Sequence, residues 1–150
     1  MSVRLRAALT AALVFASAGA LAQSAGDPAE RELITRVAER LEPARKAASE
    51  ACGTPLAIAF DPQSLTPGGL TPGSSPFARL TACRAAFSAV AARCAAPEGR
   101  AAVAQNVSAL LCVSSSTRLI SLSEGILRFE EKPGAPDPES FVETFLLDAL

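Results

Sequence analysis

The sequence contains no histidine, no tryptophan and no tyrosine. Without histidine the chain cannot form a Ser-His-Asp or Cys-His catalytic arrangement, a histidine metal site or an imidazole pH switch. Surfaces that stack bases or sugars usually present tryptophan or tyrosine, which this chain lacks. The formal net charge is only -1, without the basic excess typical of nucleic-acid-binding proteins. We therefore expect no nucleic-acid partner.

The composition is that of a folded domain. The chain has 150 residues, of which 49% are hydrophobic and 19% charged, so it can bury a core of one domain's size. The sequence shows no glycine-rich phosphate loop and no calcium-binding loop pattern. We expect neither a cofactor nor a metal ion.

Residues 1–22 have the pattern of a secretory signal peptide. Arg4 and Arg6 precede an apolar run, and Ala20-Leu21-Ala22 forms a small-x-small cleavage site. The run is shorter than the ~20 residues that span a bilayer. The interpretation is cleavage after Ala22, which leaves a single α+β domain, 23–150, without a membrane span. We expect this domain in the bacterial periplasm or the medium.

The four cysteines, Cys52, Cys83, Cys94 and Cys112, all lie in the mature part. An even number of cysteines in an exported chain indicates disulfides, here two. Zinc ligands usually come in pairs spaced about two to four residues apart. The gaps of 31, 11 and 18 residues do not fit that spacing.

Helix geometry restricts how the cysteines pair. Cys83 and Cys94 fall in one expected helix, about 16 Å apart, whereas a disulfide requires Cα atoms within about 7 Å. A right-handed β-α-β crossover brings the end of that helix near the start of its first strand. We therefore expect Cys52–Cys94 and Cys83–Cys112. Pairing of Cys52 with Cys83 and of Cys94 with Cys112 stays the alternative.

The hydrophobic pattern predicts the order α-β-α-β-β-β-α, a small four-stranded mixed sheet with helices packed on it. Asp27 and Asp137 are expected N-caps, each followed by proline at the first helical position. Pro43 either kinks the first helix or starts a second one. The expected helices are 28–52, 76–96 and 138–149, with a further turn at 100–105, and the expected strands are 55–60, 107–113, 117–123 and 126–131.

The last two strands are expected to form a hairpin about Glu124-Gly125. A two-residue loop pairs Leu122 with Leu127 and Ile120 with Phe129, which places these four side chains on one face. The strand before the hairpin, 107–113, is apolar on both faces, as is typical of a central strand. Glu130 and Glu131 are expected at a solvated strand end.

The succession of a helix, Cys-Gly, a short strand ending in Phe-Asp, a Cys-x10-Cys helix and a hairpin resembles a family of small exported bacterial proteins of unknown function. The resemblance covers about residues 28–150. It implies the same exported, cysteine-containing domain and no particular activity.

Two classes of function remain. The first is a non-catalytic binding, inhibitor or accessory protein of the bacterial envelope, whose partner is another envelope or secreted protein. Its candidate contact surface is the Pro/Gly-rich loop 61–76, with Asp61, Leu65 and Leu70. The second is a hydrolase that uses carboxylates only, such as a cell-wall glycosidase. There Asp61 requires a second carboxylate about 5–9.5 Å away.

Overall fold

The computed structural model describes residues 28–61, 78–132 and 134–150. The expected signal peptide and two residues of the expected contact loop, Leu65 and Leu70, lie outside these ranges. The elements are α1 (Pro28–Cys52), β1 (Ala57–Phe60), α3 (Ala78–Arg93), α4 (Pro97–Asn106), β2 (Ala109–Ser114), β3 (Leu119–Ser123), β4 (Ile126–Glu131) and α5 (Pro138–Ala149). None of the described helices is both long and apolar enough to cross a membrane.

The strands form one mixed sheet in the order β1-β2-β4-β3. β1 and β2 pair in parallel, as expected for strands joined by a helical crossover, and β2 also pairs in parallel with β4. β3 and β4 form the expected antiparallel hairpin, with Leu122 opposite Leu127 and Ile120 opposite Phe129. The α+β fold class and the hairpin register are thus confirmed.

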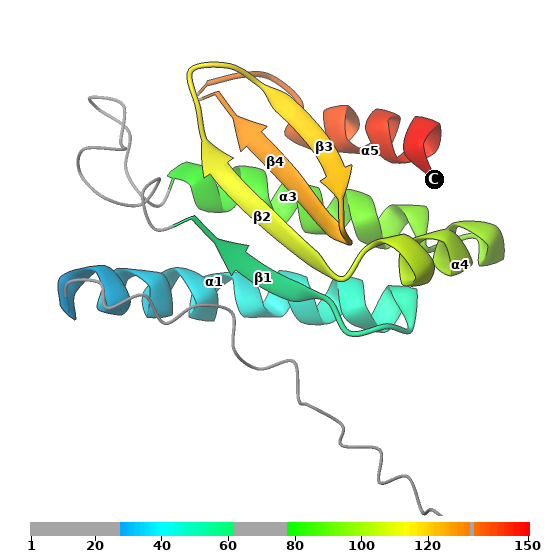
Figure 1. Cartoon of the computed structure of the whole chain (residues 1–150), viewed down its shortest axis with the longest axis horizontal. Helices are drawn as coiled ribbons and strands as arrows, with labels where there is room; N and C mark the ends of the chain where they lie inside the picture. The colour runs from blue at the N-terminus through cyan, green and yellow to red at the C-terminus, as the bar shows by residue number, and fades with distance from the viewer. Residues whose placement is uncertain (1–27, 62–77, 133) are drawn as a thin grey trace, which may run out of the picture.

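The helices lie on one side of the sheet (Figure 1). α1 contacts β1, α3 contacts β2 and β4, and α5 contacts β3, so the molecule has one sheet layer and one helix layer. Phe87 and Val90 of α3 meet Leu110, Leu127 and Phe129 of the sheet in the main core. The apolar residues spaced three and four apart along α3 and the residue after it are all buried: Leu80, Cys83, Phe87, Val90 and Cys94.

α1 runs through Pro43 as a single helix and ends at Gly53. Gly53 has a φ of 65°, its amide donates to the Glu50 carbonyl, and the Thr54 amide donates to the Ser49 carbonyl. This pair of hydrogen bonds is a Schellman motif, which favours glycine because a Cβ is strained at that φ. The expected end of this helix at residue 52 is therefore confirmed.

Side chains of α1 hold the start of β1. The Leu56 amide donates to Ser49 Oγ at 3.1 Å, and Arg45 Nη1 donates to the Leu56 carbonyl at 2.9 Å. Arg45 also binds Glu42, and this hydrogen bond is the main cause that lowers the pKa of the Glu42 carboxyl below its usual value. These hydrogen bonds attach the backbone just before β1 to the last turns of α1.

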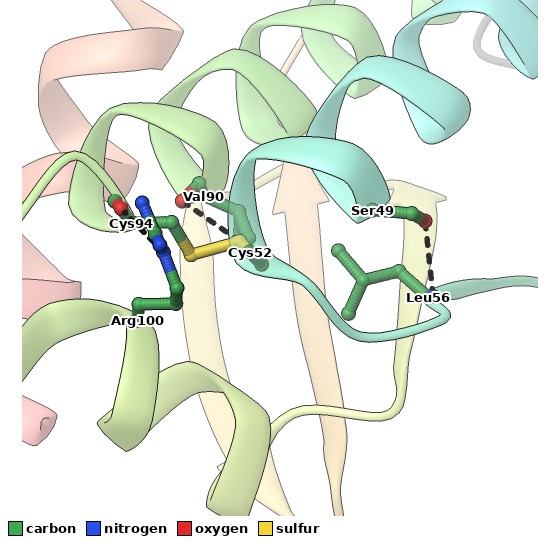
Figure 2. The surroundings of a disulfide bond; sticks show 6 residues. All are labelled: Ser49, Cys52, Leu56, Val90, Cys94 and Arg100. Carbon is green, nitrogen blue, oxygen red and sulfur yellow. Dashed lines mark hydrogen bonds between the residues drawn. A yellow bond between two sulfur atoms is a disulfide. The ribbon is translucent and has the colours of Figure 1, made fainter. Parts of the chain in front are cut away.

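Both expected disulfides are present. Cys52–Cys94 joins the end of α1 to the residue after α3, with Cα atoms 5.0 Å apart, and Cys83–Cys112 joins α3 to β2 at 5.9 Å. Figure 2 shows Arg100 beside the first bridge, where its Nε donates to the Cys94 carbonyl at 3.4 Å. Cys52 Sγ lies 3.7 Å from the Val90 carbonyl oxygen, a contact without a proton because a disulfide sulfur carries none.

The segment after α3 differs from the expectation. The helix expected over 76–96 ends at Arg93, and the helical turn expected at 100–105 lies within a separate ten-residue helix, α4, that begins at Pro97. Proline suits this position because its ring presets φ and its missing N–H has no helical partner there. A Cβ on Gly99 would lie 2.0 Å from the Arg93 carbonyl oxygen, so glycine allows α4 to start directly against the end of α3.

The start of α5 also differs. Asp137 was expected to cap the helix with its side chain, but no such hydrogen bond forms. Asp137 has a φ of 48°, which is the left-handed conformation, whereas an N-cap residue is normally extended. Its backbone carbonyl still accepts the first helical hydrogen bond, from the Phe141 amide at 3.2 Å.

Candidate binding surface

The sheet face opposite the helices is called the open face here, because no described helix crosses it (Figure 1). Its residues follow from strand alternation. Leu110 and Leu127 point into the core, so their neighbours along each strand point the other way. The open face comprises Ala57, Ala59, Ala109, Leu111, Val113, Leu119, Ser121, Ser123, Ile126, Arg128 and Glu130.

The centre of the open face is apolar. Leu111 and Ile126 are half-buried, whereas Ala109 and Val113 of the central strand are buried. Leu119, at the outer strand, has 56% of its surface exposed. A parallel strand that is apolar on both sides is normally covered on both, yet β2 has a helix layer on one side only among the described residues.

An ion pair lies beside this apolar centre. Arg128 Nε donates to Glu130 Oε1 at 2.8 Å, and both side chains lie on β4 within the open face. The expectation of a solvated strand end at Glu130 and Glu131 is wrong, because their side chains are only 21% and 13% exposed. Both carboxylates are bound by arginine, which compensates for their lost hydration.

The arginine that binds Glu131 is Arg118, and it links the hairpin to α5. Its Nε and Nη2 donate to the two Glu131 carboxylate oxygens at 3.2 and 2.9 Å, and Nη1 donates to the Pro136 carbonyl. The guanidinium carbon also lies 5.0 Å from the centre of the Phe141 ring, a cation-π distance. One side chain thus connects the start of β3 with β4 and the start of α5.

Asp61, the candidate from the sequence, directly follows β1 and is half-buried. Phe60 pairs with Cys112, so the next residue comes opposite Val113, and Val113 pairs with Glu130. Asp61 and Glu130 therefore lie in one row with a strand between them. A hydrolase that uses carboxylates only would have to use Asp61 and Glu130 as its pair in this row. The Glu130 carboxylate, however, is bound to Arg128.

A small hollow of about 180 Å³ lies between α3 and α5 and is lined by Ala92, Arg93, Glu143 and Leu147. Arg93 Nε is buried and has no hydrogen-bond partner among the described residues. Sites for small organic ligands usually measure about 300–1,000 Å³, so the hollow is small for one. The described residues contain no group of three or more acidic or cysteine side chains placed to hold a metal ion.

Sequence reasoning did not identify the two arginines, although the sequence carried a signal for each. Arg128 and Glu130 are two residues apart on one strand, and such residues share a face. Arg118 and Glu131 come directly opposite when the hairpin register is extended by one pair beyond Leu119 and Glu130. The open face itself had no such signal, because the pattern of a strand does not say how many layers cover it.

Comparison with known proteins returned no match to any family model, curated protein or solved structure. The resemblance to small exported bacterial proteins therefore stays a prediction that rests on the cysteine and strand pattern.

Proposed function

We propose that this protein is an exported, disulfide-stabilised binding protein of the bacterial envelope, without a catalytic role, and that the open face binds another envelope or secreted protein. The observation that carries the proposal is a central strand, β2, apolar on both faces, with described helices over only one of them. Apolar side chains such as Leu111 and Ile126 on a rigid sheet favour contact with a partner.

The chemistry of the open face favours a protein as the partner. The strands of the face carry one arginine and one glutamate, and Asp61 follows at the end of β1, so the face offers no basic excess to a nucleic acid or an anionic membrane. Among its described side chains it carries no aromatic ring on which a sugar could stack. A protein surface with an apolar patch and flanking charges of both signs complements Leu111, Ile126, Arg128 and Glu130.

Export and the disulfides fit this role. The proposed signal peptide sends the chain to an oxidising compartment, in which Cys52–Cys94 and Cys83–Cys112 persist. A small domain fixed by two such bonds is suited to hold one surface in a constant shape, because a preorganised surface loses little entropy on binding.

Substitution of Leu111 tests the proposal. The full chain with a C-terminal tag is expressed in its own host, and the partner that co-purifies in stoichiometric amount is identified and isolated. We expect Leu111→Glu to weaken the affinity for that partner at least about tenfold, because a buried unpaired carboxylate costs more than 1.4 kcal/mol.

The matched control is Ser88→Glu, which adds the same charge at an exposed position of α3 in the helix layer. We expect this variant to bind within about twofold of the parent, since surface changes outside an interface are nearly neutral. Circular dichroism and thermal unfolding establish that both variants are folded. Equal affinities of the two variants, or the absence of any stoichiometric partner, would contradict the proposal.

A further inference from the structure

The two disulfides lie in different surroundings. Cys52 and Cys94 are 2% and 0% exposed and belong to the main core between the sheet and the helices. Cys83 is 5% exposed, but its partner Cys112 is half-buried and is the only one of the four half-cystines that is not buried. A thiol reduces a disulfide by approaching one of its two sulfurs, so an exposed bridge reacts more readily than a buried one. The two bridges therefore differ in their access to a reducing thiol.

The bridge Cys83–Cys112 also lies beside a smaller core. Among the described residues a separate cluster, called the second core here, holds four buried side chains from α1 and α3: Val37, Leu41, Leu80 and Cys83. The main core holds sixteen, so the second core is much the smaller of the two. A region with few buried apolar side chains opens locally at a lower free energy than the rest of a domain. Local opening of the second core therefore exposes this bridge while the main core stays closed.

The helix α1 is divided between the two cores. Val37 and Leu41 of its first half pack in the second core, whereas Ala48 and Cys52 of its second half pack in the main core. Pro43 lies between the halves and has no amide to donate to a helical hydrogen bond. The first half can therefore separate from the domain while the bridge to Cys94 holds the second half in place.

From these observations we infer that Cys83–Cys112 is a redox-sensitive bridge, which a protein dithiol reduces while Cys52–Cys94 stays closed, and that its loss opens the second core. Because the bridge joins α3 to β2, its reduction frees the start of α3 together with the half of α1 that packs on it. The inference concerns the bridge alone and does not depend on the proposed binding role.

The chemical step is a thiol–disulfide exchange. A thiolate of the dithiol attacks Cys112 Sγ, the less buried sulfur, and the bond to Cys83 breaks. The electron pair of that bond goes to Cys83 Sγ, which takes up a proton. The second thiolate of the dithiol then attacks the mixed disulfide and releases the Cys112 thiolate, which is protonated in turn. The bridge is reduced to two thiols, and the dithiol is oxidised to a disulfide.

Timed reduction tests which bridge reacts. The chain, purified from its host with both bridges formed, is treated with dithiothreitol under native conditions and alkylated at intervals, and peptide mass spectrometry measures each bridge separately. We expect Cys83–Cys112 to be reduced at least about tenfold faster than Cys52–Cys94. Thioredoxin whose resolving cysteine is replaced by serine is expected to form its mixed disulfide on Cys112. Equal rates for the two bridges, or faster reduction of Cys52–Cys94, would overturn the inference.

Hydrogen exchange tests the consequence of reduction. After reduction of Cys83–Cys112 alone, we expect the amides of residues 33–41 to exchange at least about tenfold faster than in the oxidised chain. The amides of residues 44–52, in the same helix, are the internal control and are expected to exchange as before. Unchanged exchange over 33–41, or equal acceleration of both halves, would contradict the opening of the second core alone.

A matched pair of variants separates local opening from unfolding of the whole domain. Val37 and Val103 are both buried valines on helices, one in each core. We expect Val37→Ala to speed the reduction of Cys83–Cys112 at least about threefold, because a cavity in the second core favours its opening, and Val103→Ala to change this rate less than about twofold. Equal acceleration in the two variants, or none in Val37→Ala, would contradict reduction through local opening.

Discussion

Replacement of Cys52 and Cys94 by alanine together is expected to lower the free energy of unfolding by about 4 kcal/mol. The bridge closes a loop with a sequence separation of 42 residues, and the unfolded chain without it gains the corresponding conformational entropy. Both half-cystines are buried in the main core, so alanine is the substitution that adds no polar group there. Urea denaturation of the parent and the double variant measures the difference.

The second bridge provides the comparison for this result. Cys83→Ala with Cys112→Ala opens a loop with a separation of 29 residues, for which the same relation gives a loss about 0.3 kcal/mol smaller. We therefore expect two similar, large losses of stability. A loss below about 1 kcal/mol for Cys52 and Cys94 would contradict the view that this bridge stabilises the domain by constraining the unfolded chain.

Arg118→Ala is expected to lower the free energy of unfolding by about 3 kcal/mol. The substitution removes a guanidinium that binds Glu131, Pro136 and Phe141, and it leaves the Glu131 carboxylate, only 13% exposed, without its cation. An unpaired charge at a position with so little solvent exposure lowers the free energy of unfolding. Chemical denaturation measures the loss.

The matched control is Arg36→Ala on α1. Arg36 also binds a glutamate, Glu32, but the two side chains are 63% and 64% exposed. Exposed pairs of this kind contribute little, so we expect a change within about 0.5 kcal/mol. Similar losses for Arg118→Ala and Arg36→Ala would show that Arg118 does not fasten the hairpin to α5.

The hairpin and the disulfides illustrate what the sequence could predict. The register of β3 and β4 followed from a two-residue turn and alternating apolar residues, since only one register places Ile120, Leu122, Leu127 and Phe129 on one face. The disulfide pairing followed because the expected helix separates Cys83 from Cys94 by too great a distance for a bond, and because the crossover has a fixed hand. In both cases local geometry left few alternatives.

Other features depend on tertiary contacts that no local pattern specifies. The insertion of β4 between β2 and β3 makes β3 an edge strand, and chain order alone does not determine this arrangement. Asp137 has the residue type of an N-cap but a left-handed backbone, so its side chain does not cap α5. The candidate binding surface of the structure, the open face, differs for the same reason from the loop that the sequence indicated. Asp61 follows a strand as expected, yet the apolar surface beside it depends on how many layers cover the sheet, which the pattern of the strands does not specify.

The most direct test of the proposed binding role is a photo-activated cross-link from the open face in the living host. A benzophenone amino acid at Leu111 lies on this face, and the same residue at Ser88 lies on the helix layer. The account predicts that position 111 gives one defined adduct with a single envelope or secreted protein, and that position 88 gives none. An adduct of equal yield at position 88, or no adduct at position 111, would contradict it.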